Sequence, residues 1–150
     1  MMFAKSIKAY EEAYHDFFTA MDYLEERLEG QRFLFGDYVT DSDVRLYVTL
    51  VRFETCYYRF LGPLEKDLRG YKNLWEYSRD LYEIPAFKNN TYFKDLAKDY
   101  GAGAPAEGSF VPYNERFWDE LDFEAKWTQP QNRRKLSKTP EQKFLISKNK

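Results

Sequence analysis

This chain is poor in cysteine and histidine, with one of each among its 150 residues. A single thiol excludes an internal disulfide framework and is compatible with a reducing compartment, so we expect a cytoplasmic location. One cysteine and one histidine cannot complete the tetrahedral ligand set of a usual zinc centre, so no metal site is expected. Cysteine or serine catalysis would depend on Cys56 or His15, and nothing in the sequence brings the two together.

Long apolar runs and glycine-rich phosphate loops are also absent from the sequence. No apolar stretch approaches the roughly 18 residues that a membrane span needs, and no signal peptide is expected. Without a glycine-rich loop there is no cradle for nucleotide phosphates. The sequence therefore argues against a membrane protein and against phosphate-loop chemistry.

The net charge is only −2, but the two signs are unevenly distributed. Residues 128–150 contain seven Lys or Arg and one acid, Glu141, which gives this segment a net charge of +6. The preceding residues therefore carry −8, which argues against a main surface that binds phosphates. A basic tail can bind nucleic acid or anionic lipid, but such tails are more often solvated, so nucleic-acid binding is disfavoured.

Aromatic residues are abundant and make up 19% of the chain, including 13 Tyr and 13 Phe. One interpretation is a ring-rich core between helices. Another is that some tyrosines line a cavity for a flat ligand, because the ring is apolar and its hydroxyl can bind a polar ligand atom. Both interpretations stay open at the level of composition.

Helical periodicity dominates the first hundred residues. Apolar residues recur at three- and four-residue spacing from Ser6 to Glu29, which predicts a long amphipathic helix with Gly30 just beyond its end. Asn73 is a candidate N-cap for a later helix. Further helical segments are predicted at 64–68, 74–82 and 86–100. No strand of any weight is present, so the predicted fold class is all-α.

The start of the second helix carries the most specific local signal. Thr40, followed three residues later by Asp43 and then by an apolar run, is a capping box. In this motif each side chain binds the backbone N–H of the other residue. The helix is predicted to run from Asp41 to about Leu61. Arg52 lies within it, and a buried arginine needs a partner, so we expect a structural ion pair with an acid: Asp80, Glu54 or Asp43.

The composition changes abruptly after residue 100. Residues 101–108 are rich in Gly, Ala and Pro, as is typical of a linker. We therefore predict a helical domain at 1–100, followed at 101–127 by a linker and an aromatic, acidic segment that packs back on the bundle. The final segment, 128–150, is predicted to be a basic, flexible tail.

The capping box and two longer strings carry a family resemblance. The capping box, coming after the turn at 33–37, resembles the folding signature of the C-terminal helical domain of glutathione transferases. The longer strings resemble those of the Xi class, the glutathionyl-hydroquinone reductases. They comprise residues 43–46, 49–53 and Tyr57 in one helix, and 71–82 followed by Pro85 in the next. The resemblance covers about residues 3–112. It departs at Glu54, where the family has Asp, and in the extension beyond Pro112.

The resemblance implies a glutathione transferase C-terminal-like helical bundle. In that family a thioredoxin-like half precedes the helices, binds glutathione and supplies the catalytic cysteine, whose thiolate attacks the sulfur of a glutathionyl-hydroquinone. Cys56 does not match that cysteine, so no catalytic residue is expected in this chain. The helical half holds the quinol ring with aromatic side chains. The expected substrate-binding residues are Tyr57, Tyr100, Tyr82, Tyr10 and Tyr14.

The function implied by the resemblance is the substrate-binding, hydrophobic-site half of such a transferase, expected to be inactive alone because the thioredoxin-like half is absent. The expected ligand is an aromatic small molecule, the expected assembly a homodimer through helical faces, and glutathione is implied only for the intact family protein. An alternative is a helical protein–protein interaction module of the same fold, since an uncovered apolar face favours a partner. Nucleic-acid binding by the tail is a third, disfavoured alternative.

Overall fold

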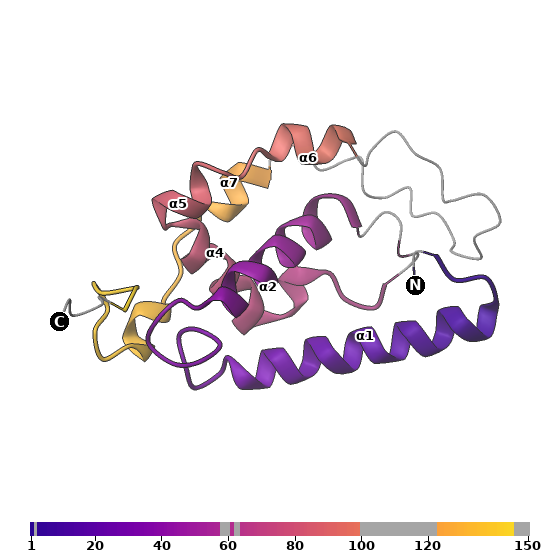
Figure 1. Ribbon diagram of the computed structural model, residues 1–150, viewed down its shortest axis with the longest axis horizontal. Coiled ribbons are helices and arrows are strands. Elements are labelled where there is room, and N and C mark those ends of the chain that lie inside the picture. The colour runs from indigo at the N-terminus through magenta and orange to yellow at the C-terminus, as the bar shows by residue number, and fades with distance from the viewer. Residues whose placement is uncertain (2, 58–60, 62–63, 100–122, 146–150) are drawn as a thin grey trace.

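A computed structural model describes residues 1, 3–57, 61, 64–99 and 123–145, and every regular element in these ranges is helical (Figure 1). The predicted all-α fold class is therefore confirmed for the described part of the chain. The α-helices are α1 (Ile7–Arg27), α2 (Asp41–Arg52), α4 (Lys72–Tyr82), α5 (Pro85–Lys88), α6 (Phe93–Asp99) and α7 (Phe123–Trp127). Turns of π- or 3-10 helix are η1 (Phe53–Tyr57), η2 (Leu68–Gly70) and η4 (Arg133–Leu136). Within the described ranges, no helix combines the length and the apolar character needed to cross a membrane.

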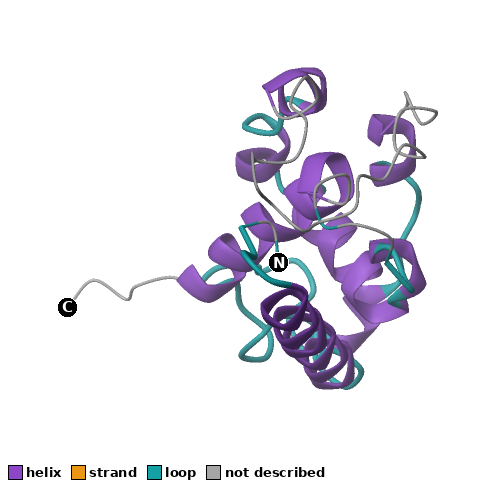
Figure 2. Ribbon diagram, turned by 90° about the vertical axis from the view of Figure 1, so that its right-hand side faces the viewer, coloured by secondary structure: helices purple, strands orange, loops and turns teal. Residues whose placement is uncertain are grey.

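The long helix α1 begins and ends within two residues of its predicted bounds. Ser6 caps its start, because the Ser6 hydroxyl oxygen accepts the N–H of Ala9 at 3.1 Å. Viewed along α1, the other helices gather on one side of it (Figure 2). The core lies on that side, where Met21 of α1, Leu50 of α2 and Leu74 of α4 are all buried.

The predicted capping box is present at the start of α2 and reaches beyond it. One oxygen of Asp43 accepts both the N–H and the hydroxyl of Thr40, each at 2.7 Å. The other oxygen accepts the N–H of Leu34 and the hydroxyl of Tyr77, each at 2.9 Å. Four donors offset the cost of burying the Asp43 carboxylate completely. The cap therefore also ties α2 to α4 and to the preceding turn.

A cluster of aromatic rings joins α7 to the body. Trp127 is completely buried, and its ring centroid lies between 5.2 and 6.0 Å from those of Tyr47, Trp75, Tyr82 and Phe93. These tilted and edge-on contacts are favoured arrangements for aromatic pairs. Trp127 ends the segment predicted to pack back on the bundle, whereas residues 101–122 of that segment lie outside the described ranges.

The second helix is not a continuous α-helix over its predicted length, and residues 58–60 of that length lie outside the described ranges. The helix was expected to reach about Leu61, but α2 ends at Arg52 and the π-helical turn η1 follows. The hydroxyl of Thr55 donates to the carbonyl of Val51 at 2.6 Å and competes with the backbone N–H that would continue the α-helix.

The helix predicted at 86–100 is also wrong in extent, because α5 and α6 are separate. Asn90 donates from its side-chain amide to the carbonyl of Ala86, and the Thr91 hydroxyl donates to that of Phe87, both at 2.9 Å. Side chains thus take carbonyls that a continuing helix would use. The piece predicted at 64–68 is likewise replaced, by the 3-10 turn η2.

The segment from residue 128 to residue 145 is docked on the body, which corrects the prediction of a flexible tail for these residues. In Figure 1 it lies beside the turn that joins α1 to α2. The N–H of Val39 donates to the carbonyl of Lys143 at 2.8 Å, and the N–H of Lys138 donates to the Asp37 carboxylate at 3.1 Å. Arg133, expected in solvent, is only 1% exposed.

Candidate functional site

A cleft of about 940 Å³ opens beside the N-terminal half of α1 and the end of η1. Ala9 and Ala13 line it from α1, and their small side chains leave room for a flat ring. Phe3, Phe17 and Leu61 supply apolar walls. A concave, mostly apolar space of this size is typical of small-molecule sites. We therefore take this cleft as the candidate site.

Two polar side chains line the cleft within the described part of the chain, those of Tyr57 and Asp16. Tyr57 is partly buried and stands at the end of η1. Single π-helical turns are frequent at functional sites, because the extra residue redirects the side chains that follow. Asp16 is exposed on α1 and makes no hydrogen bond or ion pair within the described part of the chain. The described lining of the cleft is therefore mostly apolar, with the phenol of Tyr57 and the carboxylate of Asp16 as its polar side-chain groups.

Tyr10 and Tyr14, two predicted ligand contacts, use their hydroxyls to hold the chain that borders the cleft. The Tyr10 hydroxyl donates to the carbonyl of Leu61 at 2.7 Å, and burial raises the pKa of this phenol. The Tyr14 hydroxyl accepts the N–H of Glu65 at 3.2 Å. These two contacts hold Leu61 and Glu65 against α1. Leu61 in turn forms part of the cleft wall.

Tyr82 and Tyr100, the other predicted contacts, are not brought to the cleft. Tyr82 is buried in the ring cluster, and its hydroxyl donates to the Glu124 carboxylate at 3.3 Å. Burial, with the Glu124 charge as a second cause, raises the pKa of Tyr82 to about 12. Tyr100 lies outside the described residues. Of the described predicted residues, Tyr57 is the one that lines the cleft.

Cys56 is the single thiol of the chain and is a core side chain. It is 2% exposed, as expected for a small buried residue. Burial is the main cause that raises the pKa of this thiol to about 11, so it stays protonated near neutral pH. A reactive cysteine needs the opposite, a lowered pKa and access to the substrate.

The helices around the cleft match a known family. Residues 7–80 fit the family model described as "Glutathione S-transferase, C-terminal domain". These residues form a glutathione transferase C-terminal domain. The match contains α1, the capping box and most of α4, which are the elements that form the core.

Several relatives share this glutathione transferase domain. The chain is 34% identical over 98 residues to the glutathionyl-hydroquinone reductase YqjG of Escherichia coli, which covers 65% of this chain and 30% of that protein. The crystal structure of the glutathione transferase Xi of Phanerochaete chrysosporium is 41% identical with a TM-score of 0.62, over 65% of this chain and 34% of that one. A glutathione transferase structure from Gordonia bronchialis is 35% identical with a TM-score of 0.75, over 90% of this chain and 40% of that one.

These matches cover a small part of each relative but a large part of this chain. The chain spans about a quarter to a third of the length of the curated relatives it matches, and it matches only their C-terminal part. The likeness to the Gordonia bronchialis structure extends well beyond residues 7–80 of this chain. The glutathione transferase fold seen there therefore includes more of this chain than the family model covers.

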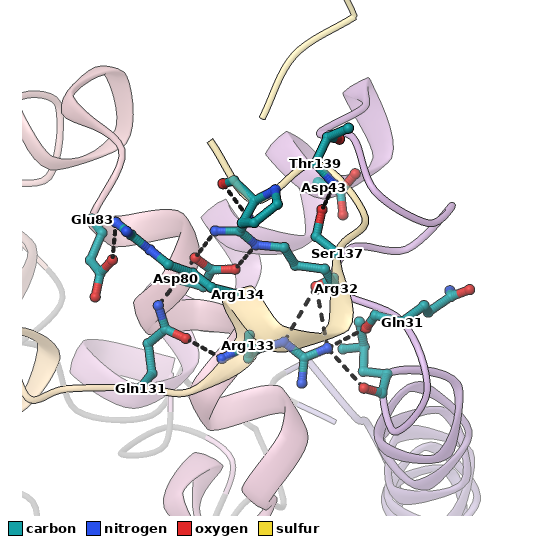
Figure 3. Close-up of polar contacts among 12 residues, drawn as sticks. Gln31, Arg32, Asp43, Asp80, Glu83, Gln131, Arg133, Arg134, Ser137 and Thr139 are labelled. Carbon is teal, nitrogen blue, oxygen red and sulfur yellow. Dashed lines mark hydrogen bonds and ion pairs between the residues drawn. The ribbon is translucent and has the colours of Figure 1, made fainter. Parts of the chain in front are cut away.

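A buried ion pair in the glutathione transferase domain differs from the one predicted. Asp80 was expected to pair with Arg52, but it accepts two hydrogen bonds from Arg32, at 2.6 and 2.8 Å, in a completely buried pair (Figure 3). Gln131 also donates to Asp80 at 3.2 Å. Arg52 instead donates to the carbonyl of Val48 within α2 at 3.2 Å. Two parallel hydrogen bonds between the guanidinium and the carboxylate make the Arg32–Asp80 contact geometrically specific. Neither residue of this pair lines the cleft.

Arg133 completes this network from the C-terminal segment. Its guanidinium donates to the carbonyl of Leu28 at 2.8 Å and to those of Gln31 and Arg32, where the chain leaves α1 (Figure 3). Burial lowers the pKa of this arginine, and the nearby Asp80 charge opposes that shift. Sequence reasoning missed this role, because Arg133 looks like any other cation of a basic tail.

Proposed function

We propose that this chain binds the ring of a phenol or hydroquinone in the cleft beside α1, as the substrate-binding part of a Xi-type glutathione transferase. The observation that supports this most is the apolar cleft of about 940 Å³ with Tyr57 in its wall. A tyrosine face packs well against a quinol ring, and its hydroxyl can donate to a phenolic oxygen as negative charge develops there. The relative from Escherichia coli is named a glutathionyl-hydroquinone reductase, which makes hydroquinone the first ligand to test. A cytoplasmic location, where Cys56 stays reduced, belongs to the same proposal.

Glutathione is the co-substrate that such an enzyme would use, and the cleft does not fit it. Its two carboxylates need cationic side chains or helix N-termini as partners. Among the described residues that line the cleft, the side chains include the Asp16 carboxylate and no Lys or Arg. Cys56 is buried and protonated, so the described residues offer no thiolate either. For these 150 residues we therefore propose ring binding without turnover.

Titration of the isotope-labelled chain with hydroquinone, followed by amide NMR, tests the proposal. We expect saturable shifts around the cleft with a Kd on the order of a millimolar, because a ligand of about eight non-hydrogen atoms gains only a few kcal/mol. A glutathionyl-hydroquinone with added glutathione should show no turnover.

The cleft itself is tested with two alanine variants of α1. Ala13→Leu fills the cleft and should abolish the shifts at the same hydroquinone concentrations. Ala20→Leu changes an exposed alanine that does not line the cleft and should leave the shifts unchanged. Equal binding by Ala13→Leu, or shifts scattered away from the cleft, would overturn the proposal.

Exposed apolar side chains on α2 favour a second candidate function, a helical module that binds another protein. Val44 and Val48 are 44% and 42% exposed, and Phe144 is 48% exposed. Together with Phe87 they line a shallow groove of about 310 Å³. Since uncovered apolar surface favours association, we propose a second copy of this chain as the partner, giving a homodimer. Light scattering at increasing concentration, with Val48→Lys as the disrupting variant, separates this candidate from ring binding.

A further inference from the structure

Asp16 is the one charged side chain among the described residues that line the cleft. The other described side chains that line the cleft are apolar, apart from the phenol of Tyr57, and Met1, which carries the α-amino group of the chain, lines it as well. Asp16 has no hydrogen bond or ion pair within the described part of the chain. The lysine two turns earlier on α1, Lys8, pairs with Glu12 at 3.8 Å. A ligand in the cleft therefore meets a carboxylate that is open to new partners.

We infer that Asp16 sets the ligand class of the cleft: it admits rings that carry a hydroxyl or ammonium donor and disfavours rings that carry a carboxylate or sulfonate. This inference rests on the proposed function, since it assumes that a ring binds there. A hydroxyl or ammonium group of the ligand can donate to the Asp16 carboxylate, and charge-assisted hydrogen bonds are the stronger kind. An anionic group beside Asp16 would instead face a like charge. Repulsion between two unit charges about 4 Å apart in water corresponds to roughly a fivefold loss of affinity.

Three ligands with one ring test the inference: 4-hydroxybenzyl alcohol, 4-hydroxybenzoate and 4-hydroxybenzylamine, which differ mainly in charge. For the unmodified chain we expect 4-hydroxybenzoate to bind roughly fivefold more weakly than the alcohol, and the amine at least as tightly as the alcohol. In Asp16→Asn, which keeps the shape of the side chain but removes its charge, all three Kd values should agree within about twofold.

Glu11→Gln provides the matched control, because it removes one negative charge from the exposed face of α1 without changing the cleft lining. It should keep the order of affinities seen with the unmodified chain. An unchanged order in Asp16→Asn, or the same loss of order in Glu11→Gln, would overturn the role of Asp16 while leaving ring binding intact. If the alcohol does not bind the unmodified chain at all, the proposed function fails and this inference fails with it.

Discussion

At the scale of single residues, Cys56 decides which chemistry these 150 residues can perform. Its thiol is 2% exposed, and burial raises its pKa to about 11. We expect a thiol reagent at pH 7.5 to label the folded chain on the order of a hundredfold more slowly than the chain unfolded in urea, because thiolate, not thiol, reacts. Mass spectrometry over time measures both rates.

The labelling rate should also depend on pH differently in the folded and in the unfolded chain. Because the folded pKa lies above the unfolded value, labelling of the folded chain should keep rising up to about pH 11, whereas labelling of the unfolded chain should level off above its ordinary pKa of about 8.5. Rapid stoichiometric labelling of folded Cys56 at pH 7 would contradict its assignment as a core side chain.

The tyrosines show which residue roles the sequence can predict. Tyr57, which belongs to a string with a family resemblance, lines the candidate cleft, and its role as a ligand contact stays a prediction. Tyr10 and Tyr14 were expected to face a ligand, but their hydroxyl partners, Leu61 and Glu65, each lie 51 residues away in sequence. No local pattern reveals such a partner, so periodicity predicts that a ring is inward-facing but not which group its hydroxyl meets.

At the scale of elements, helix starts were predictable where the cap is local and unpredictable where it is not. Thr40 and Asp43 are three residues apart, and the start of α2 follows from them. The start of α4 was assigned to Asn73 as the cap, but Tyr71 stands at the N-cap position. The N–H groups of Asn73 and Leu74 bind the carboxylate of Glu25, which comes from α1.

Glu25 therefore offers a test of capping from a distance. Its two oxygens accept those two N–H groups at 2.8 Å each, beside the positive end of the α4 dipole. Glu25→Ala should lower the free energy of unfolding by about 1–2 kcal/mol, as the loss of a cap does. Glu26→Ala removes the same charge from an exposed neighbour and should change it by less than about 0.5 kcal/mol. Urea titrations of both variants measure the difference, and equal effects would exclude a capping role for Glu25.

At the scale of the whole molecule, the described part of the C-terminal segment, residues 128–145, packs on the body and contributes one buried side chain, that of Arg133. The sequence shows that residues 128–150 are basic. Charge alone cannot distinguish a solvated cation from one that binds backbone carbonyls. Arg133 and Arg134 are adjacent and chemically identical, yet Arg133 is buried and Arg134 is exposed. Only the fold, by bringing the end of α1 to this position, separates their roles.

This adjacent pair gives the sharpest stability prediction. Arg133→Ala leaves the carbonyls of Leu28, Gln31 and Arg32 without their buried donor and should lower the free energy of unfolding by about 3 kcal/mol. Arg134→Ala breaks only exposed ion pairs, at 3.6 and 3.8 Å, and should cost less than about 1 kcal/mol. Thermal or urea unfolding compares the two variants, and a loss below about 1 kcal/mol in Arg133→Ala would show that its buried hydrogen bonds do not stabilise the fold.

The contact between Arg133 and the end of α1 also has a consequence for synthesis. Its guanidinium binds carbonyls that were made 101 to 105 residues earlier. Ribosomes add about 5–20 residues per second, so the nascent α1 waits several seconds for this partner. During that interval the carbonyls at the helix end bind water, and these hydrogen bonds can form only once Arg133 has left the exit tunnel.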